Sequence, residues 1–251
     1  MKMTDSIKPD APIYAASNRL TSDAPLGWLK KGWQDFRRAP WHSLSYGVIF
    51  AAIGWLLVYL SSVSEIYVVT GLFISLLIVG PALAFGLYDI SQQLEQNQAP
   101  SFRRERSKAL HEMGHELMLA LLLSLVFMFL LILTSIVMNI VTISGQAAAS
   151  AAVPLSNTAF LVVAVIFGGL LFCASSFALP MILDRDADAM TAITTSFHAV
   201  WVNKSALVLW AVLVLALVAV AFVTALIGFV LVAPVLGYAT WHGYRETIIK
   251  D

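Results

Sequence analysis

Charged residues are scarce in this chain. Of its 251 residues, 12% are charged and 59% are hydrophobic, whereas about a quarter of the residues in a typical soluble domain carry a charge. So few charges cannot cover a soluble globule of this size, which excludes that class and predicts lipid as the partner of the apolar surface. The single cysteine, Cys173, lies in an apolar run, and a lone cysteine excludes an intramolecular disulfide.

Charge is also missing from the middle of every long apolar run. Ion-coupled transporters, pumps and proton relays place ionisable side chains inside their spans. The sequence therefore argues against a proton-driven pump and leaves open a protein that binds lipid or a neutral solute. The polar parts show no phosphate-cradling loop, nucleic-acid motif or Ser/His/Asp arrangement, so we expect no nucleic-acid partner.

The apolar runs predict an all-α fold, a polytopic bundle of transmembrane helices. A spanning helix needs about 20 mostly apolar residues. The run 205–241 is too long for one span and just long enough for two short ones, so we divide it near Thr224 to Gly228. The six expected spans, paired as three hairpins, are 41–60, 66–88, 117–143, 157–183, 205–224 and 228–242.

All fifteen Lys and Arg residues lie outside these spans. The six-span topology places every one of their segments on the same face of the membrane, and by the positive-inside rule that face is cytoplasmic. Both termini are then cytoplasmic. A single span over 205–241 would put Arg245 and Lys250 on the opposite side, against the rule. The basic segments are 1–40, 89–116, 183–204 and 243–251.

Two cytoplasmic segments have the pattern of amphipathic helices that lie in the membrane interface. The first, 26–38, precedes the first expected span, and the second, Asp186 to Lys204, precedes the fifth. Residues 1–25 are polar and are expected to form a disordered tail, so that 26–251 make one membrane domain. The apolar residues at helical spacing are Leu26, Leu29, Trp33 and Phe36 in the first segment and Met190, Ile193, Phe197 and Trp201 in the second.

Each even-numbered span contains a proline: Pro81, Pro180 and Pro234. A proline inside a helix leaves the carbonyl four residues before it without its usual donor and bends the helix, which a membrane tolerates where neighbours satisfy that carbonyl. We expect these prolines to lie inside the bundle as structural kinks. The alternative is that they act as hinges or line a ligand site.

Polar residues gather at the cytoplasmic ends of the spans and predict a network between hairpins. Opposite charges there, such as Asp184 with Arg245 or Asp89 with Arg185, would hold the hairpins together where water becomes scarce. We interpret this network as mainly structural, with a docking surface as the alternative. Its expected members are Asp89, Asp184, Arg185, Asn203, His242 and Arg245.

One segment fits a catalytic motif. His111, Glu112 and His115 match HExxH, in which two histidines one helical turn apart bind zinc and the glutamate activates the bound water. The charged Glu116 follows the motif, where an uncharged residue is usual, and no third ligand stands in a recognisable pattern. The two interpretations are therefore a membrane zinc protease and a polar helix start at the third span.

Aromatic rings and histidines also gather on the cytoplasmic side. A haem, metal or quinone site is one interpretation, but amphipathic rings favour the membrane interface on energetic grounds alone. We therefore expect interface anchoring and no cofactor, with zinc or haem as the alternatives. The residues concerned are His42, His111, His115, His198, His242, Trp28, Trp33, Trp41, Trp201 and Trp241.

Four motifs carry a resemblance to a known family: Gly32 to Gly47, Gly80 to Glu95, Ala178 to Asp188 and Ala233 to Arg245. There the chain resembles a bacterial family of predicted integral membrane proteins of unknown function, some of whose members are labelled cytochrome c oxidase subunit I. That subunit holds haem and copper through histidines inside its spans, and none of the five histidines here is in mid-span. The resemblance implies a multi-pass protein of the bacterial inner membrane and brings no activity or site residue.

These patterns favour a protein that is not an enzyme. We expect a scaffold, accessory or assembly subunit of the inner membrane with its working surface on the cytoplasmic side. Its expected partners are membrane lipids and either another membrane protein or further copies of the chain. The alternatives from other classes are the zinc metalloprotease through His111, Glu112 and His115, and a small carrier for an uncharged or lipidic solute.

Overall fold

Every regular element in the described part of the computed structural model is a helix, which confirms the all-α prediction at this level. The structure describes residues 14–63, 80, 83–100, 162, 165–166, 168–185 and 187–249. Residues 83–95 and 168–175 are also helical. The named helices are α1 (Ala24–Arg38), α2 (Pro40–Val63), α6 (Ala178–Arg185), α7 (Ala189–Val202), α8 (Lys204–Val223) and α9 (Phe229–Thr247).

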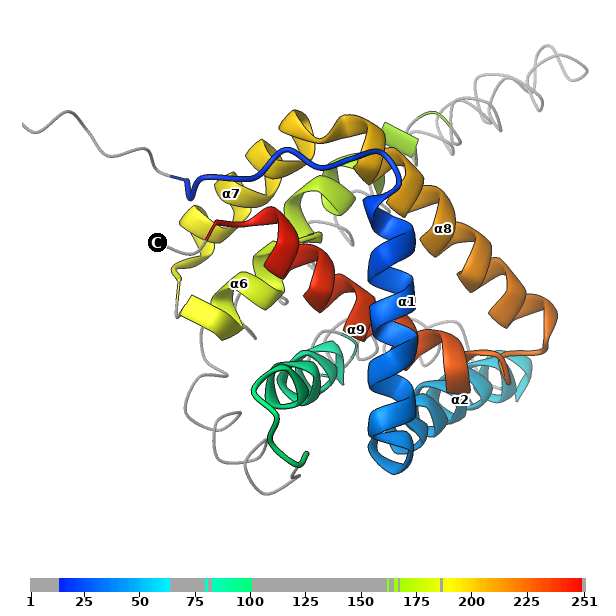
Figure 1. Ribbon diagram of the computed structural model, residues 1–251. Helices are drawn as coiled ribbons and strands as arrows, with labels where there is room; N and C mark the ends of the chain where they lie inside the picture. The colour runs from blue at the N-terminus through cyan, green and yellow to red at the C-terminus, as the bar shows by residue number, and fades with distance from the viewer. Residues whose placement is uncertain are drawn as a thin grey trace, which may run out of the picture.

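Helix α9 is the centre of the arrangement, and α1 crosses it while α2 and α8 lie beside it (Figure 1). Glycines make these close approaches possible. A Cβ atom on Gly32 of α1 would lie 2.7 Å from the Val235 carbonyl oxygen of α9, and one on Gly47 of α2 would collide with the Val230 backbone. Small residues at helix contacts let the backbones approach closely, as is common in membrane bundles.

The core beside α9 is built from large aromatic side chains. Trp28 of α1 and Trp241 of α9 are fully buried. The Trp28 ring meets the Trp210 ring of α8 edge-on, with centroids 5.6 Å apart, and the Phe177 ring at 6.3 Å. Edge-to-face contacts of this kind stabilise a core beyond simple area burial. The expectation that Trp28 and Trp241 anchor the membrane interface is therefore wrong, because both rings fill the protein interior.

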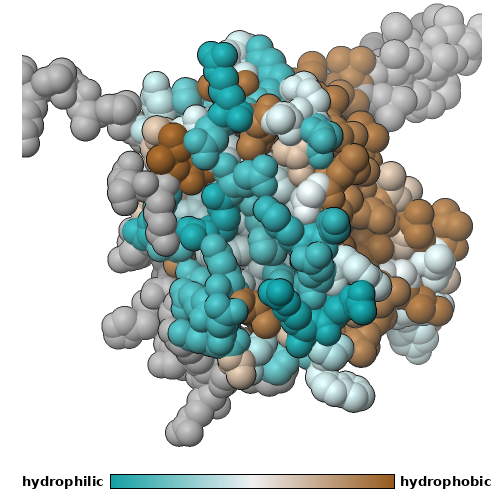
Figure 2. Space-filling model, in the orientation of Figure 1, coloured by the Kyte–Doolittle hydropathy of each residue, from teal (hydrophilic) through white to brown (hydrophobic). Residues whose placement is uncertain are grey.

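Two of the six expected spans correspond to helices long and apolar enough to cross a membrane. Within the described residues these are Pro40–Leu60 of α2 and Lys204–Val223 of α8. Figure 2 shows hydrophobic residues along the side formed by α8 and α2, and hydrophilic residues over the middle of the face that α1 occupies. Expected span 228–242 lies in α9, which is not among the candidate spans. Span 117–143 lies outside the described residues.

The expected span 157–183 is not one continuous helix in its described part. Residues 168–175 are helical, Ser176 and Phe177 form a turn, and α6 begins at Ala178. Pro180 stands in the first turn of α6, where its missing N–H is tolerated best. The Phe177 N–H donates instead to the Ser196 hydroxyl of α7 at 3.2 Å, so a neighbouring helix satisfies the break.

Pro234 lies inside α9, whereas Pro81 lies outside the described residues. The carbonyls of Leu171 and Phe172, before the break at Ser176, accept bonds from the hydroxyls of Ser175 and Ser176. Side chains thus supplement the backbone hydrogen bonds in this apolar part of the chain. Whether Pro180 and Pro234 act as hinges stays a prediction.

The segments expected to lie in the interface are both helices. In α7, the stripe expected to face lipid is exposed at Met190 and Trp201, which have 66% and 72% of their surface accessible. In α1, however, the buried side is Trp28, Gly32, Asp35 and Phe36, while Trp33 is 45% exposed. Helical periodicity identifies only the apolar side of a helix. The side of α1 that packs against α9 also includes Gly32 and Asp35, so the periodicity of its apolar residues did not predict it.

The N-terminal segment differs from the expected disordered tail. Residues 14–23 run along α7 and the end of α9 in an extended path, and Ser17 forms an isolated antiparallel bridge with Ile248 (Figure 1). We call residues 14–23 the strap. The sequence pattern missed the strap because its polar side chains bind the backbone and polar groups of distant segments. Residues 1–13 lie outside the described residues.

Candidate functional site

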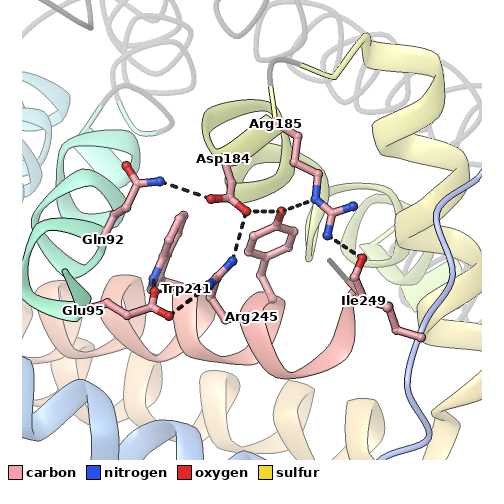
Figure 3. Close-up of polar contacts among 8 residues, drawn as sticks. Gln92, Glu95, Asp184, Arg185, Trp241, Arg245 and Ile249 are labelled. Carbon is pink, nitrogen blue, oxygen red and sulfur yellow. Dashed lines mark hydrogen bonds and ion pairs between the residues drawn. The ribbon is translucent and has the colours of Figure 1, made fainter. Parts of the chain in front are cut away.

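The polar ends of three helical segments meet on one side of the molecule (Figure 3). One segment is the end of helix 83–95, the second is the end of α6, and the third is the last two turns of α9. Each of these segments follows an apolar run of the sequence. Their first polar side chains therefore lie together at the same end of the helices. We call this set the polar cap, and its side chains are Gln92, Glu95, Asp184, Arg185, Trp241, Tyr244 and Arg245.

Asp184 is the centre of the polar cap. Its carboxylate accepts hydrogen bonds from Gln92 Nε2 at 3.2 Å, from the Tyr244 hydroxyl at 2.9 Å and from Arg245 Nη1 at 3.2 Å. Its side chain is only 6% exposed. A buried carboxylate is stable when it is paired with a cation and its remaining lone pairs accept further hydrogen bonds.

Arg245 bridges Asp184 to the helix 83–95. Its guanidinium donates to both carboxylate oxygens of Glu95, with Nη2 to Oε1 at 3.0 Å and Nε to Oε2 at 3.2 Å. The Trp241 indole N–H donates to Glu95 Oε2 at 3.2 Å. Burial alone would lower the pKa of Arg245, but hydrogen bonds and the charge of Glu95, followed by the charge of Asp184, raise it. The guanidinium of Arg245 therefore stays charged, and its two-point pairing with Glu95 fixes α9 against helix 83–95.

Tyr244 and Arg185 extend the cap to the C-terminal end of the described chain. Arg185 Nε donates to the Tyr244 hydroxyl at 3.1 Å, and Arg185 Nη2 donates to the Ile249 carbonyl oxygen at 2.6 Å. Burial raises the pKa of Tyr244 well above its ordinary value, and the nearby charge of Asp184 raises it further. The phenol therefore stays protonated and donates a hydrogen bond to Asp184.

A second buried carboxylate ties α1 to the same helices. Asp35, which is 3% exposed, accepts from the Ser91 hydroxyl at 2.6 Å and lies 2.7 Å from His242 Nε2. Nearby, the Ser43 and Tyr238 hydroxyls lie 2.9 Å apart and join α2 to α9. Polar contacts thus hold α1 and α2 against α9 at the same two helix pairs where glycines allow the backbones to approach closely.

The strap closes the cap from the other end of the chain. The Leu20 N–H donates to Asn203 Oδ1 at 2.8 Å, and Asn203 Nδ2 donates back to the Asn18 carbonyl at 2.9 Å. The Asn18 N–H donates to the Thr247 carbonyl at 2.8 Å. Asn203 therefore joins the strap to the junction of α7 and α8, and Asn18 joins the strap to the end of α9.

The structure brings together some of the residues that the sequence singled out. Asp184, Arg185 and Arg245 share the cap, whereas His242 binds Asp35 and Asn203 binds the strap. Asp89 lies within reach of Gln93, whose Nε2 is 2.7 Å from Asp89 Oδ2. The motif residues His111, Glu112 and His115 lie outside the described residues. Groups of three or more His, Cys, Asp or Glu side chains that could hold a metal are absent from the part of the chain that the structure describes.

Sequence reasoning missed Asp35, Ser91 and Glu95. One signal was available for Asp35, because it stands three residues after Gly32 and seven after Trp28, on the side of α1 that the structure buries. A carboxylate on the buried side of an amphipathic helix indicates a specific partner. Glu95 offered no such signal, because it lies in the polar run Ser91 to Gln98 at the end of its helix.

The comparison with protein families agrees with this membrane architecture. Residues 68–184 match a family described as "Predicted integral membrane protein (DUF2189)". This part of the chain is similar to that family. The match covers the motif Gly80 to Glu95 and reaches Asp184, and it confirms the resemblance noted from the sequence. No curated protein and no solved structure matches the chain.

Proposed function

We propose that this integral membrane protein is a non-enzymatic scaffold, an accessory or assembly subunit whose working surface is the polar side that carries the cap, facing the cytoplasm. The observation that carries the proposal is that the buried carboxylates of this side are occupied by partners in the same chain. Asp184 accepts from three side chains, and Asp35 contacts Ser91 and His242. Carboxylates held in this way stabilise an architecture, whereas a general base needs access to a substrate proton.

The surface beside the cap has the chemistry of a binding face. Helix α1 exposes Lys30, Arg37 and Arg38, and among the described residues these three take part in no ion pair. By contrast, Lys31 lies 3.3 Å from Glu246. Because α1 is fixed to α9 through Gly32 and Asp35, its basic side is presented in one orientation. Such a side suits an acidic surface on another membrane protein or on a second copy of this chain.

The test is the mass of the particle in nanodiscs of native lipid. We expect the wild-type particle to exceed one 27.3 kDa chain, and the triple variant Lys30→Glu, Arg37→Glu, Arg38→Glu to fall to one chain with an unchanged melting temperature. Arg19→Glu is the matched control, because Arg19 is exposed and basic but lies on the strap. A wild-type particle with a single chain at all concentrations, and no second protein, contradicts the proposal.

A further inference from the structure

The connection between α8 and α9 is unusually apolar for a loop. Residues 224–228 read Thr-Ala-Leu-Ile-Gly, and no charged residue occurs between Lys204 and Arg245. The side chains around the turn are open, with Val223 87% and Ile227 64% exposed. Figure 1 shows the turn at the edge of the described structure far from the C-terminal end, on the hydrophobic side seen in Figure 2. An exposed apolar tip of this kind is unfavourable in water.

The turn satisfies its own backbone donors. The Leu226 N–H donates to the Ala221 carbonyl at 2.9 Å and the Ala225 N–H to the Phe222 carbonyl at 3.0 Å, which is the pattern of a Schellman motif. The Gly228 N–H donates to the Thr224 hydroxyl at 3.0 Å. The N–H groups of residues 224–229 all have a partner within the turn or the end of α8. Backbone at membrane depth must have its polar groups satisfied without water and must be covered by protein. The donors of this turn meet the first condition, and Leu226, which is 8% exposed and lies against Gly54 of α2, covers one side of it.

The two arms of the hairpin are shorter than the bilayer. Trp210 of α8 packs on Trp28, whose ring lies against Gly243 of α9, next to Tyr244 of the cap. Trp241 of α9 binds Glu95, so both Trp210 and Trp241 lie near the level of the polar cap. From there, residues 211–223 and 229–240 extend only about 20 Å and 18 Å at a rise of ~1.5 Å per residue. Helix α8 as a whole is long enough to cross a membrane, but its residues Lys204 to Leu209 precede Trp210 and lie on the cap side of it. The hydrocarbon core is about 30 Å thick, so neither the part of α8 beyond Trp210 nor the arm in α9 reaches its far side.

Helix α2 provides an independent measure of the same depth. Gly54 faces the turn, since a Cβ atom there would lie 3.1 Å from Leu226 Cδ1. Helix α2 is a candidate span, and beyond Gly54 it continues to Val63. At ~1.5 Å per residue this continuation adds about 13 Å. The turn therefore ends well before α2 does.

We propose that α8 and α9 form a re-entrant hairpin, which enters the hydrocarbon core from the side of the polar cap, turns at 224–228 against Gly54 of α2 with the side chains of Val223 and Ile227 toward lipid, and returns. The hairpin then replaces the two spans expected at 205–224 and 228–242. It keeps Lys204 and Arg245 on one side of the membrane without a crossing, so the positive-inside rule is obeyed. The surface around Val223 and Ile227 is a lipid-binding tip, and its partner is the acyl chains of the bilayer interior.

The test compares two single cysteines in a Cys173→Ala background, Ile227→Cys and Val63→Cys. Both positions are exposed ends, with 64% and 61% accessible surface, but only Val63 is placed to reach the opposite interface. In sealed vesicles we expect a membrane-impermeant maleimide to label Val63→Cys from the side opposite the cap and to leave Ile227→Cys unlabelled from either side. Lys204→Cys should react from the cap side only.

Spin labels at the same positions provide the second measurement. A label at Ile227 should collide with oxygen more often than with a water-soluble nickel complex, as expected for hydrocarbon, and a label at Lys204 should show the reverse. Labelling of Ile227→Cys from the side opposite the cap, at a rate similar to that of Val63→Cys, overturns the proposal. A spin label at Ile227 that is shielded from both oxygen and nickel overturns the contact with lipid.

Discussion

The pair Asp184 and Arg245 shows how single residues hold this fold. The two side chains lie 3.2 Å apart, and Asp184 is almost fully buried. We expect Asp184→Ala to lower the free energy of unfolding in detergent by about 2–3 kcal/mol, because it leaves Arg245 and Tyr244 without their acceptor. A double-mutant cycle with Arg245→Ala should give a coupling of about 1 kcal/mol. Gln34→Ala, at an exposed polar side chain of α1, is the control. Equal melting temperatures for Asp184→Ala and the wild type would refute the network.

Tyr244 makes the stability of the cap depend on pH. Its pKa is raised above the ordinary value of 10.0, so the folded chain holds the phenol proton more tightly than the unfolded chain does. That contribution is complete below pH 10 and is lost as the pH rises above it, by up to about 1.4 kcal/mol per pH unit. The stability advantage of the wild type over Tyr244→Phe should therefore be constant up to about pH 10 and shrink as the pH rises above it in denaturant titrations. An advantage that is constant or grows above that pH would show that the phenol is not held protonated.

At the scale of elements, substitutions at two glycines of α1 distinguish the effect of helix packing from the effect of chain entropy. Gly32 meets the α9 backbone, with Ala239 N 2.8 Å from the position that a Cβ atom would take, whereas Gly27 has nothing within 4 Å. We expect Gly32→Ala to lower the free energy of unfolding by about 1–3 kcal/mol through overpacking. Gly27→Ala should raise it by about 0.4–1 kcal/mol through reduced entropy of the unfolded chain. If thermal unfolding shows the same change for both, α1 is not packed on α9 in this way.

The turn between α8 and α9 uses residues that are not ideal for it. Ala225 has a φ of 51° and Leu226 a φ of 68°, in the left-handed region that glycine adopts without strain. We expect Ala225→Gly to raise the free energy of unfolding by about 0.5–1 kcal/mol, after allowance for the greater freedom of glycine in the unfolded chain. Ala216→Gly, in the interior of α8, should instead lower it by up to about 1 kcal/mol. Destabilisation by Ala225→Gly would contradict the left-handed turn.

Hydrophobic length alone locates several elements. The expected helix 26–38 ends with α1 and begins two residues after it, and the expected span 41–60 lies within α2. The expected span 205–224 follows α8, which ends at Val223, where the run 205–241 was divided. Length and polarity are local properties, so they can be read from the chain. The partner of an apolar residue is not local. The sequence therefore could not distinguish Trp28, which is buried by Phe177 and Trp210, from Trp41, which is 81% exposed.

At the scale of the whole molecule, the strap joins the two ends of the described chain beside the polar cap. The strap and the end of α9 pair through Asn18 N–H to the Thr247 carbonyl at 2.8 Å and Ile249 N–H to the Ala16 carbonyl at 3.0 Å. The sequence could not predict this pairing, because Ser17 and Ile248 are distant in the chain and neither belongs to a periodic pattern. The pairing requires the two ends to lie on the same side of the membrane, which agrees with the distribution of Lys and Arg.

The most direct measurement is a disulfide across this bridge, in native membranes, with Cys173→Ala as the background. The hydrogen bonds on either side make Ser17 and Ile248 a non-hydrogen-bonded antiparallel pair, with Cα atoms about 4.5 Å apart, within the range for a disulfide. We predict that Ser17→Cys with Ile248→Cys forms an intramolecular disulfide almost completely on mild oxidation, whereas Ser17→Cys with Ile249→Cys does not. Failure of the first pair to cross-link, while each cysteine alone reacts with a maleimide, would contradict a polar cap closed by both ends of the chain.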